Sequence, residues 1–353
     1  MDVLEYLKQA VNARASDLHV TVSLPPIIRV DGSLEKLNDK ALMPEDTAAM
    51  VKQVLTERQL NVLLEKGEID ISFSHPGMGR FRVNAYRQRG SYGMAFRVVY
   101  SRIPSLEELG LPPTVAELTR KQRGLILVTG PTGSGKSTTL ASMIELINQE
   151  RNCHIITLED PIEYLHRHNR SVINQREVGE DTQTFANGLR ACLRQDPDVI
   201  LVGEMRDLET IAIAITAAET GHLVLSTLHT LGAANTVDRI IDVFPPYQQE
   251  QIKVQLASVM EGIISQQLMA KKSDKGRVAA FEVMIATNAI RNLIREGKTH
   301  QIQTSVQTGA KFGMVTMDNA LLKLLKEGHI SRETTMTYAQ DIDYVRRQLG
   351  SML

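Results

Sequence analysis

The feature that most constrains this chain is a glycine-rich segment, GPTGSGKS at residues 130–137. It follows an apolar run at 125–129, which predicts a buried strand, and it precedes a helical pattern at 138–148. Glycines let the backbone curl so that its N–H groups face an anion, and the dipole of the following helix favours negative charge. Because both flanks have the required character, the segment predicts a P-loop that binds the phosphates of ATP together with Mg²⁺.

The contacts expected of this loop fall on its last residues. Lys136 is predicted to contact the β- and γ-phosphates, and the Ser137 hydroxyl is predicted to ligate Mg²⁺. A glycine-rich turn without a ligand is the alternative, which the two flanking patterns disfavour. The residues predicted to bind the nucleotide are Thr132, Gly133, Ser134, Gly135, Lys136, Ser137 and Thr138.

Two further apolar runs end in carboxylates. The run at 199–202 leads to Glu204, a pattern typical of a sheet strand that delivers an acid beside the magnesium ion of a P-loop. The run at 155–158 leads to three carboxylates within five residues, the last of which is Glu163. This cluster could hold and deprotonate the attacking water, or it could be the acidic first turn of a helix, and the residues alone leave both interpretations open.

Histidines and arginines supply weaker candidates. His222 and His229 flank an apolar run, where they could sense the γ-phosphate or could be ordinary structural residues. Five arginines crowd residues 80–97, and for most of them a solvated basic face is the simplest interpretation. A P-loop ATPase nevertheless often needs an arginine from another domain or subunit to neutralise transition-state charge, an effect of about 10³–10⁵ in rate.

The N-terminal part of the chain predicts a small α+β domain over residues 1–101. Helical spacing of apolar residues occurs at 2–14 and at 44–65, where Pro44 suits a first turn and Gly67 follows the end. A turn is predicted at Asp31-Gly32. Strands are predicted at 18–22, 27–30, 69–74, 80–86 and 92–100, and three prolines mark residues 102–123 as a linker.

The rest of the chain predicts an α/β core. Short apolar runs at 125–128, 155–158, 199–202 and 223–225 alternate with helical patterns, which is typical of a parallel sheet with crossover helices. We therefore expect a P-loop domain at 124–275. Residues 276–353 are predicted to be its C-terminal helical part, with helices at 287–296, 316–327 and 331–347.

Composition bounds the classes of function. Lys and Arg number 40 against 41 Asp and Glu, and aromatic residues make up 4%, so neither charge nor base-stacking surface favours nucleic-acid binding. Cys153 and Cys192 stand far apart and are interpreted as small core residues. The sequence contains no run of about 18 apolar residues and no signal-peptide pattern, which predicts a cytoplasmic protein.

Taken together, these motifs resemble the secretion ATPases of type IV pilus and type II secretion systems. The P-loop is followed in order by LEDPIE at 158–163, LVGEMRD at 201–207 and TGHLVLSTLHT at 220–230. Three segments are similar to the retraction ATPases of that family: SDLHV at 16–20, LPPIIRVDG at 24–32 and AIRNLIRE at 289–296. The chain also lacks the tetracysteine zinc insertion that many assembly and secretion ATPases carry.

The AIRNLIRE segment has a physical interpretation beside the resemblance. Ile290, Leu293 and Ile294 are predicted to form the apolar face of a helix, and Gly297 suits its C-terminal cap. The side chains predicted to point outward are Arg291, Asn292 and Arg295.

The resemblance implies a fold and a set of roles. The fold is a PAS-like N-terminal domain followed by a RecA-like P-loop NTPase core, assembled as a homo-hexamer. Glu163 would be the catalytic base, and Glu204 would help to hold Mg²⁺. His222 and His229 would lie near the nucleotide and the domain interface.

The resemblance also implies partners and a kind of work. Arg82 and Arg97 of the N-terminal domain would reach the phosphates. ATP hydrolysis would drive pilus retraction and support twitching motility. The implied partners are an inner-membrane pilus platform protein and a paralogous retraction ATPase, with the motor docked at the inner face of the cytoplasmic membrane.

Three other functions compete with this prediction. A pilus-assembly or type II secretion ATPase would use the same chemistry for the opposite work, and the missing zinc cysteines disfavour it. A nucleic-acid translocase is disfavoured by the neutral charge. A nucleotide-gated binding module that scarcely hydrolyses ATP would have little need for both Glu163 and Glu204.

Overall fold

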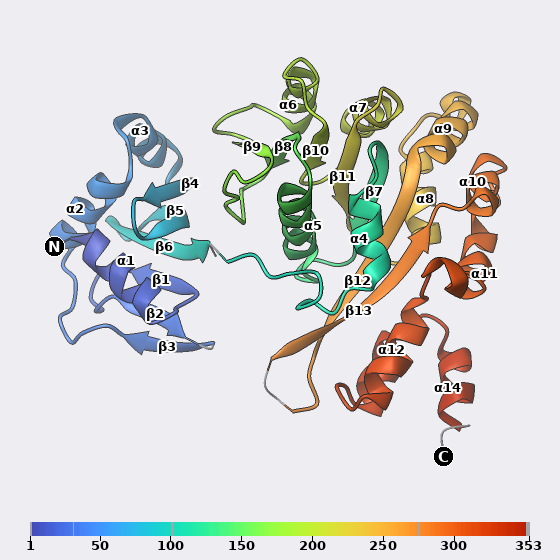
Figure 1. The fold of residues 1–353 in the computed structure, drawn as a ribbon. Helices are drawn as coiled ribbons and strands as arrows, with labels where there is room; N and C mark the ends of the chain where they lie inside the picture. The colour runs from blue at the N-terminus through green and yellow to red at the C-terminus, as the bar shows by residue number, and fades with distance from the viewer. Residues whose placement is uncertain (1, 31, 100–101, 274–275, 351–353) are drawn as a thin grey trace. The chain divides into compact units, whose positions relative to one another are not determined.

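The computed structural model describes residues 2–30, 32–99, 102–273 and 276–350 (Figure 1). The chain forms two compact units. Unit 1 comprises residues 1–102 with the short segment 163–165, and unit 2 comprises residues 103–162 and 166–353. Each unit has its own sheet and its own apolar core. Within the described residues, no helix combines the length and the apolar character that crossing a bilayer requires.

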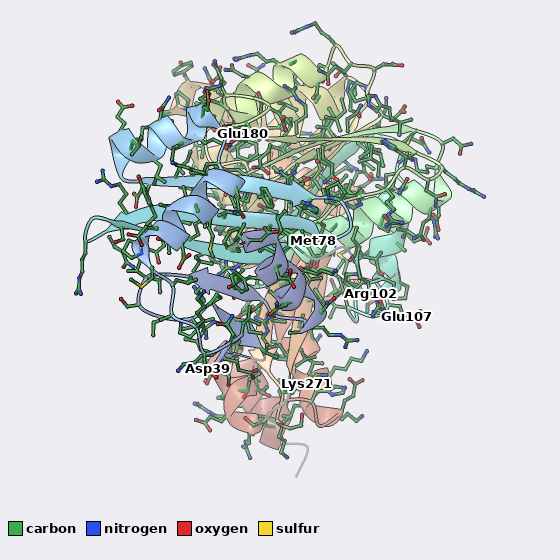
Figure 2. The ribbon with its side chains drawn as sticks, turned by 90° about the vertical axis from the view of Figure 1, so that its left-hand side faces the viewer. Asp39, Met78, Arg102, Glu107, Glu180 and Lys271 are labelled. Atoms are coloured by element: carbon green, nitrogen blue, oxygen red, sulfur yellow. The ribbon has the colours of Figure 1, made fainter. Side chains whose placement is uncertain are left out.

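Unit 1 is a six-stranded antiparallel sheet with helices packed on one face, as the α+β prediction requires. The strand order is β3-β2-β1-β6-β5-β4. Figure 2 labels Met78 in the hairpin between β4 and β5. The helices are α1 (Val3–Asn12), α2 (Pro44–Val54) and α3 (Glu57–Lys66). The strands are β1 (Asp17–Val20), β2 (Ile27–Val30), β3 (Ser33–Lys36), β4 (Glu68–His75), β5 (Gly79–Gln88) and β6 (Ser91–Val99).

The predicted helix at 44–65 is two helices, because the chain restarts at Thr56. The Thr56 hydroxyl accepts a hydrogen bond from the Gln59 amide at 3.3 Å, and the Gln59 side chain accepts one from the Thr56 amide at 3.0 Å. This reciprocal capping box begins α3. Pro44 at the start of α2 and Gly67 at the end of α3, with φ of 87°, confirm the predicted limits. Asp31 of the predicted turn lies outside the described residues.

Unit 2 contains a seven-stranded sheet in the order β13-β12-β7-β11-β10-β8-β9. All neighbouring pairs are parallel except β12 and β13, which form an antiparallel hairpin. This confirms the predicted α/β core. The strands are β7 (Gly124–Thr129), β8 (His154–Glu159), β9 (Val172–Glu177), β10 (Val199–Val202), β11 (Leu223–Leu228), β12 (Met260–Ala270) and β13 (Arg277–Ile285).

Helices cover both faces of this sheet, which explains why its strands read as continuous apolar runs. On β7, Leu125 and Leu127 join one buried cluster, whereas Ile126 and Val128 join the other. The second cluster lies under α4 (Pro113–Thr119) and α5 (Lys136–Glu150). The first lies under α6 (Phe185–Cys192), α7 (Leu208–Glu219), α8 (Ala233–Asp242), α9 (Pro246–Val259) and α10 (Asn288–Arg295).

The two cysteines and the predicted linker pack in unit 2. Cys192 is buried in the first cluster and Cys153 packs partly buried against the second, and both are free, as expected of core residues. The predicted linker at 102–123 belongs to unit 2 from Ile103 onward. Val115 and Leu118 of α4 are buried there, because the segment contributes apolar side chains to the sheet cover.

The prediction that the chain turns helical after residue 275 is wrong for its first part. Residues Arg277–Ile285 form β13, which pairs with β12 and belongs to the core sheet. The predicted helix at 331–347 is also two helices, since the Asp318 carboxylate accepts hydrogen bonds from the amides of Gln340 and Asp341 at 2.8 and 3.0 Å. The C-terminal elements are η1 (Thr299–Gln301), α11 (Ile302–Gln307), η2 (Ala310–Phe312), α12 (Met317–Lys326), α13 (Arg332–Tyr338) and α14 (Ile342–Gly350).

The AIRNLIRE segment forms α10, and one of its predicted outward residues points inward. Ile290 and Ile294 are buried, and Asn292 and Arg295 are exposed, as predicted. Arg291 instead has a side chain only 20% exposed. Its guanidinium donates to backbone carbonyls at the end of α9, because that helix end leaves acceptors without helical partners.

Candidate nucleotide-binding site

The glycine-rich loop leaves β7 and enters α5 with a backbone that other residues would strain. Gly130, Gly133 and Gly135 have φ of 143°, 77° and 92°, in the region that L side chains rarely adopt. A Cβ on Gly130 would also overlap the backbone carbonyl oxygen of Gln266 and lie 2.7 Å from Ser134 Oγ. The sequence pattern therefore corresponds to a curled loop at a helix N-terminus, the geometry that can hold phosphate groups.

Lys136 and Ser134 place a cation and a buried hydroxyl at the loop. The Lys136 side chain turns back over the loop, and its Nζ donates to the carbonyls of Gly130 and Pro131, both at 3.0 Å. Ser134 is 3% exposed, and its Oγ makes no hydrogen bond within the part of the chain that the structure describes. A buried hydroxyl without a partner is unfavourable and is often found where a ligand supplies one.

The oxygen donors at this edge of the sheet fit a magnesium ion bound through a nucleotide. β7 and β10 are members of one parallel array, so Ser137 and Glu204 both follow the carboxyl ends of its strands. Mg²⁺ prefers such hard oxygens and is usually bound by one or two protein groups plus substrate phosphates. Among the described residues there is no group of three or more His, Cys, Asp or Glu side chains that could cage a metal. Ser137 and Glu204 offer two such oxygens, and a bound nucleotide would supply the others.

Glu204 is held at the end of β10 by two cationic or polar neighbours. Arg206 Nε lies 2.8 Å from one carboxylate oxygen, and His229 Nε2 lies 3.5 Å from the other. The Thr227 hydroxyl donates to the Gly203 carbonyl at 2.6 Å, which keeps the ends of β10 and β11 together. A pocket of about 380 Å³ is lined by residues that include Glu204, Arg206, Thr227 and His229. The sequence predicted Glu204 and His229 as two separate candidates. The structure brings their side chains into contact.

His222 lies at the edge of the sheet opposite the P-loop, and its expected place near a nucleotide and the domain interface stays a prediction. It precedes β11, whose first residue, Leu223, pairs with Gly124, whereas Leu228 pairs with Thr129 beside the loop. The five residue-to-residue steps from Leu223 to Leu228 span roughly 17 Å. The His222 ring bonds the Ala217 carbonyl at 2.9 Å and so fixes the turn after α7.

The acidic cluster after β8 is not the first turn of a helix. Residues 160–170 contain no helix, and the backbone of Ile162 donates to Glu177 Oε2 at 3.0 Å. Glu159 accepts from the Thr157 hydroxyl at 2.6 Å and from Gln175 Nε2 at 3.1 Å. Glu163 is exposed. The helical alternative is therefore wrong, and the role of Glu163 as catalytic base stays a prediction.

Arg82 and Arg97 stand side by side on the exposed face of the unit 1 sheet. They are direct cross-strand partners on β5 and β6, with the buried Phe81 and Phe96 on the opposite face. Arg97 Nε donates to Asp17 on β1 at 3.0 Å. Like charges opposite each other on a sheet repel, so an anion between them would be favourable. Both residues belong to unit 1, whereas the P-loop belongs to unit 2.

Sequence reasoning missed Gln266, a buried side chain beside the loop. Its Nε2 donates to the Ser134 carbonyl at 2.6 Å, and its Oε1 accepts from the Thr139 hydroxyl at 2.9 Å. The signal was present as an amide pair, Gln266-Gln267, within the apolar run that forms β12. A polar residue in a strand that is covered on both faces needs an internal partner.

Comparisons with known proteins identify the family. The sequence profile of the family described as "Type II/IV secretion system protein" matches residues 2–336. A Pseudomonas aeruginosa protein named "Type IV pilus retractation ATPase PilT" is 48% identical over 340 residues, covering 96% of this chain and 98% of that protein. A Neisseria gonorrhoeae protein named "Twitching motility protein" is 48% identical over 316 residues, covering 90% of this chain and 84% of that protein.

A solved structure gives the same answer for the fold. The crystal structure of the pilus retraction motor PilT with bound ADP is 50% identical and matches with a TM-score of 0.93. The match covers 98% of this chain and 99% of that one, so it includes both units. The predicted resemblance and the RecA-like fold class are confirmed, and the chain belongs to the type II/IV secretion system protein family.

Proposed function

We propose that this chain is a magnesium-dependent ATPase whose hydrolysis of ATP powers the retraction of type IV pili and thereby supports twitching motility. The observation that carries the proposal is the curled loop from Gly130 to Ser137 with the buried Lys136 folded over it. The near full-length similarity to retraction motors supports the kind of work.

The chemistry that these residues support is positioning and charge neutralisation of a phosphoryl group. Backbone N–H groups of residues 133–138 and the Lys136 ammonium would hold the phosphates. Ser137 and Glu204 would hold Mg²⁺, which when bound neutralises charge on the phosphate oxygens. Arg206 and His229 orient the Glu204 carboxylate. Glu163 would orient the attacking water and accept its proton.

Work would come from movement between domains. We propose an N-terminal domain at 1–101 and a core at 124–275, joined by 102–123 and completed by 276–353. Arg82 and Arg97 would contribute charge to a phosphate site when an N-terminal domain closes on a core. Six copies would form a ring that acts on an inner-membrane platform protein at the cytoplasmic face, with a paralogous ATPase as a further partner and no nucleic acid.

The first test separates catalysis from folding. Lys136→Ala removes the charge-assisted contact to the phosphates, and we expect phosphate release to fall at least a hundredfold. Glu163→Gln should lower the turnover number while leaving ADP binding intact. The exposed Lys326→Ala and Glu180→Gln are matched controls (Glu180 is labelled in Figure 2). If Lys136→Ala releases phosphate at the wild-type rate, the loop is not the site of ATP hydrolysis.

The second test separates retraction from assembly. Cells whose only copy carries Glu204→Ala should display more surface pili and should not twitch, because pili are made and not withdrawn. Fewer pili would instead assign the chain to assembly or secretion. Unchanged pili together with ATPase activity that DNA stimulates would favour a translocase.

A further inference from the structure

The side chain of Gln266 joins the phosphate loop at Ser134 to the first turn of α5 at Thr139. Gln266 is 1% exposed and lies on β12, next to Ser265, which pairs with Thr129 at the end of β7. Lys271, labelled in Figure 2, follows the far end of this strand. Because the Ser134 carbonyl can only accept a hydrogen bond, the amide must direct Nε2 to Ser134 and Oε1 to Thr139.

The bond to Ser134 sets the direction of a backbone donor. In a planar trans peptide the carbonyl and the N–H point in opposite directions. Holding the Ser134 carbonyl against Gln266 at 2.6 Å therefore turns the Gly135 N–H away from β12. That N–H belongs to the curl of the loop, where donors face the phosphate groups.

The bond from Thr139 fixes the helix that carries the reactive side chains. Thr139 is 2% exposed and lies in the first turn of α5, two residues after Ser137. Gln266 therefore connects the loop to the turn that positions the phosphate lysine and the magnesium ligand. Its own backbone carbonyl approaches Gly130 closely, so the same residue limits the loop from its first glycine to its helix.

We infer that Gln266 is a positioning residue of the nucleotide site, whose buried amide holds the Ser134–Gly135 peptide and the start of α5 in the orientation that binds phosphate groups. The inference rests on the proposed nucleotide-binding function and names a residue that acts through the loop and not on the substrate.

The neighbouring Gln267 provides a matched control. It is also an amide on β12 and is 7% exposed, but its Nε2 donates to the Tyr338 carbonyl at 3.4 Å, away from the loop. Replacing either glutamine by methionine keeps the length of the side chain and removes its hydrogen bonds. The two variants lose similar packing, and only Gln266→Met loosens the loop.

The test is calorimetric titration of the full-length chain with ADP and Mg²⁺. We expect Gln266→Met to bind ADP about tenfold more weakly, since two buried hydrogen bonds no longer orient the loop. Gln267→Met should bind within about twofold of wild type. ADP should also raise the melting temperature of Gln266→Met less than that of Gln267→Met. Wild-type affinity in Gln266→Met, or equal weakening in both variants, would overturn the inference.

Two further results keep the test decisive. If Gln266→Met does not fold, Thr139→Val removes one of the two bonds and should weaken ADP binding about threefold, whereas unchanged affinity would overturn the inference. A wild-type chain that fails to bind ADP would refute the proposed function itself. If only the role of Gln266 is refuted, the wild-type chain still binds ADP. The two refutations are therefore distinguishable.

Discussion

Arg291 offers a test of how a motif that resembles retraction ATPases contributes to function. Its guanidinium donates to the Ala257 and Ser258 carbonyls, both at 2.8 Å, and to the Ala286 carbonyl at 3.1 Å. It also pairs with Glu261 at 2.6 Å. These contacts tie the start of α10 to the end of α9 and the start of β12. We therefore predict that Arg291→Ala acts mainly through stability.

The expected magnitude follows from these contacts. Each hydrogen bond to a charged group contributes about 1.5–3 kcal/mol before offsets. The Arg291 side chain is 20% exposed, and the carbonyls at the end of α9 can bind water once it is removed. Side-chain entropy and desolvation reduce the sum further. We expect Arg291→Ala to lower the free energy of unfolding by about 3 kcal/mol.

Arg295 on the same helix is the matched control. It is exposed, and its Nη1 donates only to the Asn292 side chain at 2.6 Å among the contacts described. Arg295→Ala should change the free energy of unfolding by less than about 0.5 kcal/mol. The assay is urea unfolding at one fixed protein concentration, because the proposed assembly would also stabilise the chain. Equal stability of the two variants would refute the reasoning. Lost motility in Arg295→Ala with normal ATPase activity would assign the exposed face to partner binding.

Two remaining predictions concern the loop and pH. Gly130→Ala should abolish ADP binding, because the new Cβ would overlap the Gln266 carbonyl, whereas Gly328→Ala meets only backbone strain at φ 77° and should bind ADP normally. Burial holds the pKa of His166 below its usual value although Glu145 opposes the shift, so the folded chain resists protonation there. Stability should therefore fall as pH drops from about 7.5 to 5.5 through the unfolded pKa of about 6.5. The melting temperature of His166→Gln should fall less over this pH range than that of wild type, whereas the exposed His300→Gln should behave like wild type. Equal pH dependence of the melting temperature in the two variants would contradict this role of His166.

The parts of the fold that the sequence predicted are those that local patterns determine. The P-loop was predictable because its glycines, its strand and its helix are consecutive in the chain. Gly67 and Pro44 were likewise read from local capping preferences. The split of one long helix at Thr56 was missed, although the capping residues Thr56 and Gln59 have the required spacing.

The missed features depend on contacts between distant segments. Arg291 points inward because the end of α9 supplies acceptors, which helical periodicity cannot reveal. β13 was assigned to a helical region because its place in the sheet depends on pairing with β12, which a local pattern does not reveal. The position of His222 could have been predicted, because it precedes its strand whereas His229 follows the same strand. In a parallel sheet only residues after the strands share the edge of the P-loop.

The β12–β13 hairpin explains why the site and the C-terminal helices form one body. Ser265 accepts from the Gly232 amide at 2.9 Å. Glu282, its partner on β13, accepts from the Ala233 amide at 2.7 Å at the start of α8. The second Glu282 oxygen accepts from the Met317 amide at 3.4 Å at the start of α12.

Burial raises the pKa of Glu282, while the two helix amides oppose the shift by favouring its charged form. A carboxylate in so apolar a position is unfavourable unless both oxygens are bonded, which requires α8 and α12 to keep their places. The loop that carries His229 is thereby fixed to the C-terminal helices, as Gln266 fixes the phosphate loop to β12. Polar residues in an apolar strand, which a search for motifs passes over, thus hold both halves of the nucleotide site in register.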